Sequence, residues 1–404
     1  MITSKKLLLP VAFLLTFSIG FEIGGFQLVL LRIAEEFSLG GASMGGLVAI
    51  QSAAVIIFPL LFGNVADKIG KKKVMLFFVA LFVMGCLIVT AVPSIIAFVI
   101  GIFILGAGFS MCETVSSAAV ADAYLGQQSK YLNIIQCFFC MGAVTGPLFG
   151  DYAVTKLGLN WRVVFVVCGV VFAMLFVLIL FTKFERSLSN ISQQDSGQAT
   201  QPGHESSAAW SIKSYGILIG PIFGSLLLSI TLYVALETGL GFFMNSLFTE
   251  KLSMPEFSAA AIALFWFAMM LSRVLASVLY RYQKEITVIA FLGAVIFSLV
   301  LACINVPVLS LVCSFVLGFT LGPIWPNIIS IATQKFPAHT GMVTGVLQSG
   351  SGLGGAISPI LMGYVANAYG ITISFMLLVL IAAIGCAAIF FVCIRRPKQS
   401  SPIQ

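Results

Sequence analysis

Three glutamates stand inside long apolar stretches of this sequence, where a carboxylate is costly. Glu22, Glu113 and Glu237 each lie among largely uncharged residues, as in "ILGAGFSMCETVSSAAVAD" around Glu113. A charge at the centre of a bilayer costs roughly 2.5 to 3.5 kcal/mol on insertion scales, so each acid should face a cavity or a partner. A carboxyl group in such a setting can bind and release a proton near neutral pH. This is the chemistry that a proton-coupled carrier needs, although each glutamate could instead only fix helix packing.

Uncharged polar side chains stand in the same stretches. Amide groups both donate and accept hydrogen bonds, and an indole offers a flat apolar face, so together they suit a neutral polyol such as a sugar. Arg273 is expected near the inner end of its span, paired with an inner-face gate, which leaves no cation at mid-span for an anionic solute. Each amide could equally serve as a bond between helices. Together with the acids Glu22 and Glu237, the candidate substrate-binding residues are Gln51, Gln136, Asn245, Trp325, Asn327 and Gln348.

The elements that must position these residues are membrane-spanning helices. Of the 404 residues, 60% are hydrophobic and only 9% are charged, whereas about a quarter of a soluble domain is charged. The apolar residues come in blocks of about twenty, the length that spans a bilayer as a helix. The pattern predicts an all-α integral membrane protein with twelve spans, at 7–31, 43–65, 74–92, 95–121, 131–157, 162–182, 214–242, 257–280, 286–304, 308–333, 340–366 and 371–394.

The basic residues indicate how these spans are oriented. If the N-terminus is inside, sixteen of the 21 Lys and Arg residues fall in cytoplasmic segments and four fall outside. Cytoplasmic loops carry such an excess of Lys and Arg, so the net charge of +7 reflects topology and not nucleic-acid binding. We therefore expect a plasma-membrane protein, in bacteria of the inner membrane, with both termini cytoplasmic.

The chain divides into two related halves. A Ser-, Gln- and Gly-rich segment without an apolar period reads as a flexible linker. It predicts an N-terminal six-helix bundle at 1–182, a cytoplasmic linker at 183–213 and a C-terminal bundle with a short tail at 214–404. Three sequence pairs repeat at nearly one offset: Glu22 with Glu237 (215 residues), Leu105 with Leu317 (212) and Gly142 with Gly355 (213). Two pseudo-symmetric six-helix halves are the layout of a transporter whose substrate site lies between them near mid-membrane.

The segment "GNVADKIGKKK" lies in the loop between spans 2 and 3. Gly63 and Gly70 permit a close approach and a tight turn, and Asp67 can meet the N-terminus of a neighbouring helix. The segment resembles the signature loop of the major facilitator superfamily, G-x-x-x-D-R-x-G-R-[RK], with lysine where arginine is usual. The resemblance implies a twelve-helix transporter fold in which Gly63, Asp67 and Gly70 form a gating loop. The lysines that follow could also simply fix topology.

A narrower resemblance rests on spans 1, 4, 5 and 7. An acid in span 1, a Cys-Glu-Thr acid in span 4, Leu132-Asn133-x-x-Gln136 in span 5 and "YVALETGLGFFMNSLF" in span 7 are similar to the fucose/glucose-galactose (FHS-type) permeases. The resemblance implies that Glu22 contacts the substrate and that Glu113 carries the proton. Glu22 stands where that family usually has aspartate. "GPIWPNIISIA" in span 10 replaces a Phe-Pro-Thr stretch, which leaves the particular sugar open.

These features favour a monomeric secondary transporter that couples entry of a sugar, or a similar small neutral polar solute, to protons. The alternative is a proton antiporter that exports drugs or metabolites, and sodium coupling stays open. No metalloprotease motif HExxH is present. The nine cysteines include a CxxC at Cys137 and Cys140 without further ligands, so we expect no metal and no cofactor.

Overall fold

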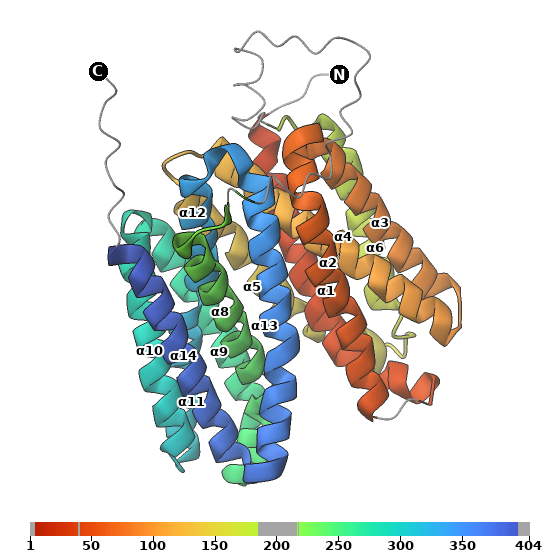
Figure 1. The fold of residues 1–404 in the computed structure, drawn as a ribbon. Helices are drawn as coiled ribbons and strands as arrows, with labels where there is room; N and C mark the ends of the chain where they lie inside the picture. Colours follow the sequence, from red (N-terminus) through yellow and green to blue (C-terminus); the bar gives the residue numbers. More distant parts are fainter. Residues whose placement is uncertain (1–4, 39–40, 185–215, 217, 395–404) are drawn as a thin grey trace, which may run out of the picture.

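The computed structural model is an all-helical bundle in which residues 5–38, 41–184, 216 and 218–394 are described (Figure 1). Short 3₁₀ or π-helical turns adjoin the long helices; they are η1 (Lys5–Leu7), η2 (Tyr152–Lys156), η4 (Leu247–Lys251), η5 (Pro255–Phe257), η6 (Tyr280–Tyr282) and η7 (Pro337–His339). The long helices are α1 (Leu8–Glu36), α2 (Gly41–Ile69), α3 (Lys71–Ala91), α4 (Ile95–Ala123), α5 (Gln128–Asp151), α6 (Val163–Phe181), α8 (Pro221–Ser246), α9 (Ser258–Val278), α10 (Gln283–Cys303), α11 (Pro307–Leu321), α12 (Ile324–Lys335), α13 (Thr340–Tyr369) and α14 (Ile371–Ile394). The predicted linker, 183–213, falls almost wholly outside the described residues.

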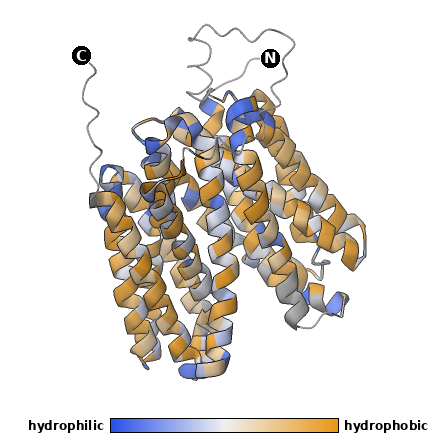
Figure 2. Cartoon of the chain, viewed as in Figure 1, coloured by the Kyte–Doolittle hydropathy of each residue, from blue (hydrophilic) through white to orange (hydrophobic). Residues whose placement is uncertain are grey.

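Within the described residues, eleven helical segments are long and apolar enough to cross a membrane. One of these segments, Pro307–Lys335, contains both α11 and α12. The sequence predicted one continuous span there, but the helix is interrupted by a turn at Gly322 and Pro323. Proline cannot continue the backbone ladder, which accounts for the break. The remaining long helix, α13, is long enough to cross a membrane but is not among these eleven segments, because its many glycine and serine residues make it less apolar. Hydrophobic residues predominate along the helices (Figure 2), and many large apolar side chains are exposed, as lipid contact requires.

The two halves pack in the same way. α1 packs closely on α5, and α8 packs closely on α13. A Cβ atom on Gly142 or Gly146 of α5 would collide with the α1 backbone, and one on Gly354 of α13 would collide with the α8 backbone. Small residues at such crossings let helices approach closely. Gly142, Gly146 and Gly354 therefore permit these two close crossings.

The halves meet through α2 against α13 and α5 against α9. If α1 to α6 correspond to α8 to α14 in order, with α11 and α12 counted as one span, these two contacts are equivalent. The interface is thus pseudo-symmetric, as the sequence repeats predict. It brings α4, α5 and α13, which carry Glu113, Gln136 and Gln348, to the boundary between the halves.

Candidate functional site

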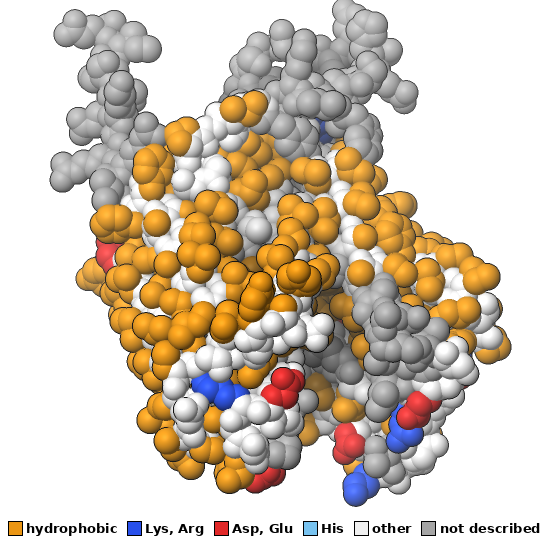
Figure 3. All heavy atoms as spheres, turned by 60° about the horizontal axis from the view of Figure 1, so that its bottom comes forward, with side chains coloured by type: hydrophobic (Ala, Val, Ile, Leu, Met, Phe, Trp, Pro, Cys, Tyr) orange, Lys and Arg blue, Asp and Glu red, His pale blue; other side chains and the backbone are white. Residues whose placement is uncertain are grey.

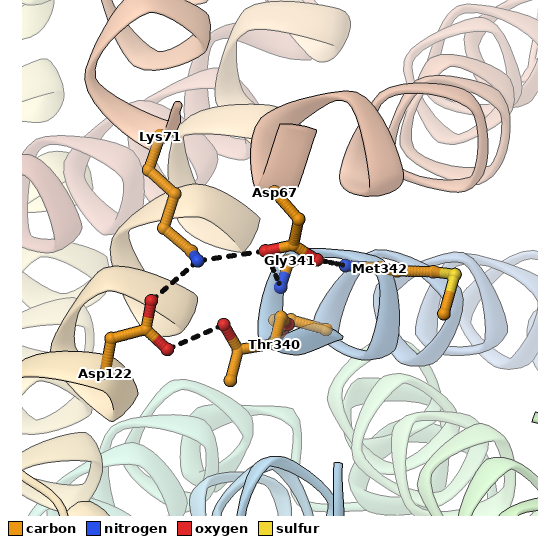
Figure 4. Close-up of polar contacts among 7 residues, drawn as sticks. Asp67, Lys71, Asp122, Thr340, Gly341 and Met342 are labelled. Carbon is orange, nitrogen blue, oxygen red and sulfur yellow. Dashed lines mark hydrogen bonds and ion pairs between the residues drawn. The ribbon is translucent and has the colours of Figure 1, made fainter. Parts of the chain in front are cut away.

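One end of the interface is closed by a polar contact that we call the gate cluster (Figure 4). Its members are Asp67, Lys71, Asp122, Thr340, Gly341 and Met342. The Asp67 carboxylate accepts the backbone N–H groups of Gly341 and Met342, each at 2.9 Å. These are free donors of the first turn of α13, where the helix dipole favours a negative charge. Asp67 of the first half therefore caps a helix of the second half.

Lys71 and Asp122 extend the gate cluster to α3 and α4. The Lys71 ammonium lies 2.9 Å from Asp67 Oδ1 and 2.7 Å from Asp122 Oδ2. The hydroxyl of Thr340 donates to Asp122 Oδ1 at 2.7 Å. All four side chains are buried or nearly so, and burial leaves an ammonium or a carboxylate stable only when it is paired. The contact is therefore a buried network that holds α13 against α2 and α4.

Both loop glycines have the geometry that the sequence indicates. A Cβ atom added to Gly63 would lie 2.6 Å from the Gly341 carbonyl oxygen, so glycine permits the crossing of α2 and α13. Gly70 has a φ of +102° immediately before α3, a conformation that other L-residues rarely adopt. The gating role of Gly63, Asp67 and Gly70 in transport stays a prediction.

A second, uncharged layer of contacts joins α5 to α12 near the same end. Asn327 Oδ1 accepts hydrogen bonds from Ser129 (2.8 Å) and from the Asn133 amide (3.0 Å). The Asn327 amide donates to the Gln283 carbonyl oxygen at 3.2 Å. Asn327 was predicted to bind substrate. In this conformation, its side chain is fully buried and bonded across the two halves.

Glu113 lies at mid-span on α4, between the two halves. Gln136 of α5 donates to its Oε1 at 3.1 Å, and Gln348 of α13 donates to its Oε2 at 2.8 Å. The side chains of Glu113, Gln136 and Gln348 were all predicted to take part in the site, and the structure brings them together. Their neighbours on α4, Ser116 and Ser117, are buried in the same region. The cluster places one ionisable group where both halves contact it.

Arg273 is the residue that sequence reasoning placed wrongly. The expected pairing with the inner-face gate is wrong, because the guanidinium instead crosses from α9 to α5. It donates to the Gln136 carbonyl oxygen (3.0 Å) and to Cys140 Sγ (2.9 Å) in the first half. In its own half, it donates to the Gly322 carbonyl oxygen (2.9 Å) and to the Tyr233 hydroxyl (3.5 Å). Five fixed N–H donors make arginine suited to such a bridge. The free carbonyl at the Gly322–Pro323 break was the signal that could have indicated it.

Glu237 lies with Arg273 on the side of the second half. The Tyr233 hydroxyl hydrogen-bonds Glu237, and Arg273 acts electrostatically on both Glu237 and Glu113. The interface thus holds two carboxyl groups and one guanidinium, supplied by α4, α8 and α9. Trp325, on α12, is buried in an apolar cluster formed mainly by the second half, and its binding of substrate stays a prediction. Asn245 belongs to α8, but its side chain lies outside the described residues.

Glu22 does not join this cluster. It is fully buried, and the Gln51 amide donates to its two carboxyl oxygens at 3.2 and 3.5 Å. Glu22 acts electrostatically on Cys86 and Cys168, which lie on α3 and α6 of the same half. Among the described residues, these partners of Glu22 all belong to the N-terminal bundle. Substrate binding and proton coupling at Glu22, and substrate binding at Gln51, stay predictions.

The end opposite the gate cluster is hollowed between the two halves (Figure 3). Among the described residues, hydrogen bonds join the halves from the gate cluster, through Asn327, to Glu113 and Arg273. The bundle is therefore closed at the gate end and open at the other. A separate surface hollow of about 490 Å³ lies at the far end of the first half; it is lined by Arg32, Glu35, Glu36, Val154, Leu159, Asn160 and Trp161.

Comparison with known proteins agrees with this geometry. A sequence model of the Major Facilitator Superfamily matches residues 12–338 and 226–404. The chain belongs to the major facilitator superfamily. Proteins of this superfamily are membrane transporters, so the chain is a transporter and not an enzyme. Its all-helical bundle of two six-helix halves is the fold of that superfamily.

Individual relatives are distant. A putative glucose/galactose transporter of Helicobacter pylori is 25% identical over 334 residues, covering 78% of each chain. A crystal structure of the superfamily transporter FucP in the outward conformation gives a TM-score of 0.81 at 17% identity, covering 95% of this chain and 98% of that one. A second structure, of the E. coli fucose:proton symporter FucP, gives 0.79 at 16% identity with the same coverage. The structural likeness establishes the fold.

Proposed function

We propose that this protein imports a sugar, or a similar small neutral polar solute, together with protons by alternating access. The observation that carries the proposal is the position of Glu113, whose carboxylate is bonded at mid-span by amides from both halves. A proton taken up there changes the charge of a group that both halves contact. The names of the relatives support the sugar and the proton, because one is a putative glucose/galactose transporter and another is a fucose:proton symporter.

The remaining lining fits a neutral solute. Arg273 has four hydrogen-bond acceptors within the protein, so its guanidinium is occupied in this conformation. Gln136 and Gln348 present amides on opposite sides of the gap between the halves. Solute hydroxyls can both donate to and accept from such groups. In the proposed cycle, substrate and proton enter from the open end, the gate cluster separates, and the bundle opens at the gate end.

We also propose that the gate end faces the cytoplasm of a monomeric inner-membrane protein. Lys68, Lys71, Lys72 and Lys73 all lie at the junction of α2 and α3, at that end. Basic residues collect on the cytoplasmic side of membrane proteins. With that orientation, the described conformation is open to the outside, where a proton-driven importer loads its substrate.

The test is uptake of labelled hexoses into liposomes with and without an imposed pH gradient. Glu113→Gln should abolish uptake driven by the gradient and spare exchange of solute between equal pH on both sides, since an amide cannot carry the proton. Glu250→Gln is the matched control, because Glu250 is exposed in η4, directly after α8. Gradient-driven uptake by Glu113→Gln would refute the coupling role. Extrusion of preloaded cationic dye, without hexose uptake, would favour the antiporter alternative, and a response to sodium alone would replace the proton.

A further inference from the structure

The hydrogen bonds around Glu113 match one protonation state. A carboxylate only accepts, and here each of its oxygens faces an amide N–H group, from Gln136 on one side and from Gln348 on the other. A protonated carboxyl group donates through one oxygen, so one of the two amide N–H groups would then meet an O–H group. Protonation of Glu113 therefore weakens or reverses one of these two hydrogen bonds, because the hydroxyl oxygen of a neutral acid is a poorer acceptor than a carboxylate oxygen.

Gln136 and Gln348 differ in the half to which they belong and in their other hydrogen bonds. Gln136 belongs to the same half as Glu113, and its main-chain oxygen is also bound by Arg273. Gln348 belongs to the other half, and its own Oε1 is a buried atom without a hydrogen-bond partner. Turning the Gln348 amide over would present that Oε1 to an O–H group on Glu113. The unpaired Oε1 therefore belongs to Gln348, the amide that links the two halves. It could accept a hydrogen bond from the O–H group of protonated Glu113.

Helices α4 and α13 are joined by hydrogen bonds at two places along their length. α13 contacts α4 through Thr340 and Asp122 at the gate end, and through Gln348 and Glu113 further along. Glu113 and Asp122 are nine residues apart, which is about 13 Å along the helix. The charged groups that act on Glu113 are Arg273 of α9 and Glu237 of α8. The gate charges of Asp67, Lys71 and Asp122 lie at the other contact, so Gln348 is a direct and separate link to the acid.

We propose that Gln348 transmits the protonation state of Glu113 to the C-terminal half. This inference rests on the proposed proton coupling and adds the residue that conveys it. The ionised acid holds α13 through a charge-assisted hydrogen bond, which is about twice as strong as a neutral one. The protonated acid holds it through a neutral bond or none. Proton uptake therefore loosens α13 from α4 and favours separation at the gate end.

The test measures opening of the gate end without any sugar. Spin labels are attached through p-acetylphenylalanine at Leu125 and Tyr282, one in each half and each 60% exposed, which leaves the native cysteines in place. Distance distributions are recorded in lipid nanodiscs in mildly acidic and mildly alkaline buffer. The variants are Gln348→Met, which keeps the length of the side chain, Gln348→Leu, and Glu113→Gln. Ser349→Ala is the matched control, because Ser349 is buried on α13 but bonds only within its own helix.

In the parent protein, acid should raise the ratio of gate-open to gate-closed molecules about fivefold, the effect of exchanging a charge-assisted for a neutral hydrogen bond. Both Gln348 variants should show a raised ratio that no longer responds to pH, and Ser349→Ala should respond as the parent does. Well-folded Gln348 variants that keep the parental pH response would overturn the inference while leaving the proposed function intact. A parent protein without any pH response, together with hexose uptake that ignores the pH gradient, would overturn both.

Discussion

Replacing Asp67 with asparagine should open the gate end. The substitution keeps the size of the side chain and removes its charge. In the gate-closed state, the Asp67 carboxylate accepts two backbone N–H groups of α13 and the Lys71 ammonium. Asparagine retains one acceptor oxygen and turns an NH₂ group toward the remaining donors. At least one donor at the start of α13 is then left unpaired in the closed state.

The size of the effect follows from these contacts. A buried donor without a partner costs about 1–3 kcal/mol, and the loss of a charge at a helix N-terminus adds up to about 2 kcal/mol. Lys71 keeps its ion pair with Asp122, which limits the total. We therefore expect the closed state to lose about 2–3 kcal/mol relative to the open state, or about 30- to 150-fold in their ratio.

The measurement is the distance distribution between labels at Leu125 and Tyr282, in the absence of substrate. Glu250→Gln serves as the control, since it removes one exposed carboxylate at the far end. A population of gate-closed molecules in Asp67→Asn that matches the parent within about twofold would refute the reasoning, because the helix cap would then contribute nothing to closure. Thermal unfolding should show that the variant remains folded.

Three further outcomes follow from named contacts. Gly63→Ala should also favour the gate-open state, by about 1–3 kcal/mol of overpacking against Gly341, as the same label pair would show; an unchanged distribution would contradict the close crossing. Arg273→Lys should lower the free energy of unfolding by about 2–4 kcal/mol, because an ammonium cannot reach all four hydrogen-bond acceptors. The midpoint of thermal unfolding should fall accordingly, and an unchanged midpoint would show that the bridge contributes nothing. The hydrogen bond from Arg162 lowers the pKa of Glu36, so this pair stabilises the fold above the unfolded-state pKa and its contribution is lost as the pH falls through the lower folded-state pKa. Arg162→Ala should therefore reduce the unfolding midpoint slightly at neutral pH and not in strong acid, and equal losses at both would argue against the pair.

The sequence by itself determined the helices and their pairing into halves. Apolar blocks of spanning length leave no alternative to membrane helices, since a backbone in lipid must satisfy its own hydrogen bonds. The offset that relates Gly142 to Gly355 predicted that α5 and α13 are equivalent, and Gln136 of α5 and Gln348 of α13 both reach Glu113. Gly63 and Gly70 indicated a close approach and a tight turn, because the absence of a Cβ atom can be read directly from the sequence.

Only the tertiary structure decided which polar residues share a site. The partner of a buried side chain depends on how its helix is rotated about its axis and on how it crosses its neighbours. Neither can be read from the sequence of one span. Glu22 and Glu113 look alike in sequence, yet Glu22 is bonded within one half while Glu113 is bonded by both. Arg273 seemed to be a residue of the inner rim, but its long side chain reaches across to α5. The charge balance of the interface therefore depends on packing, which sets each ionisable group among the partners that make its burial tolerable.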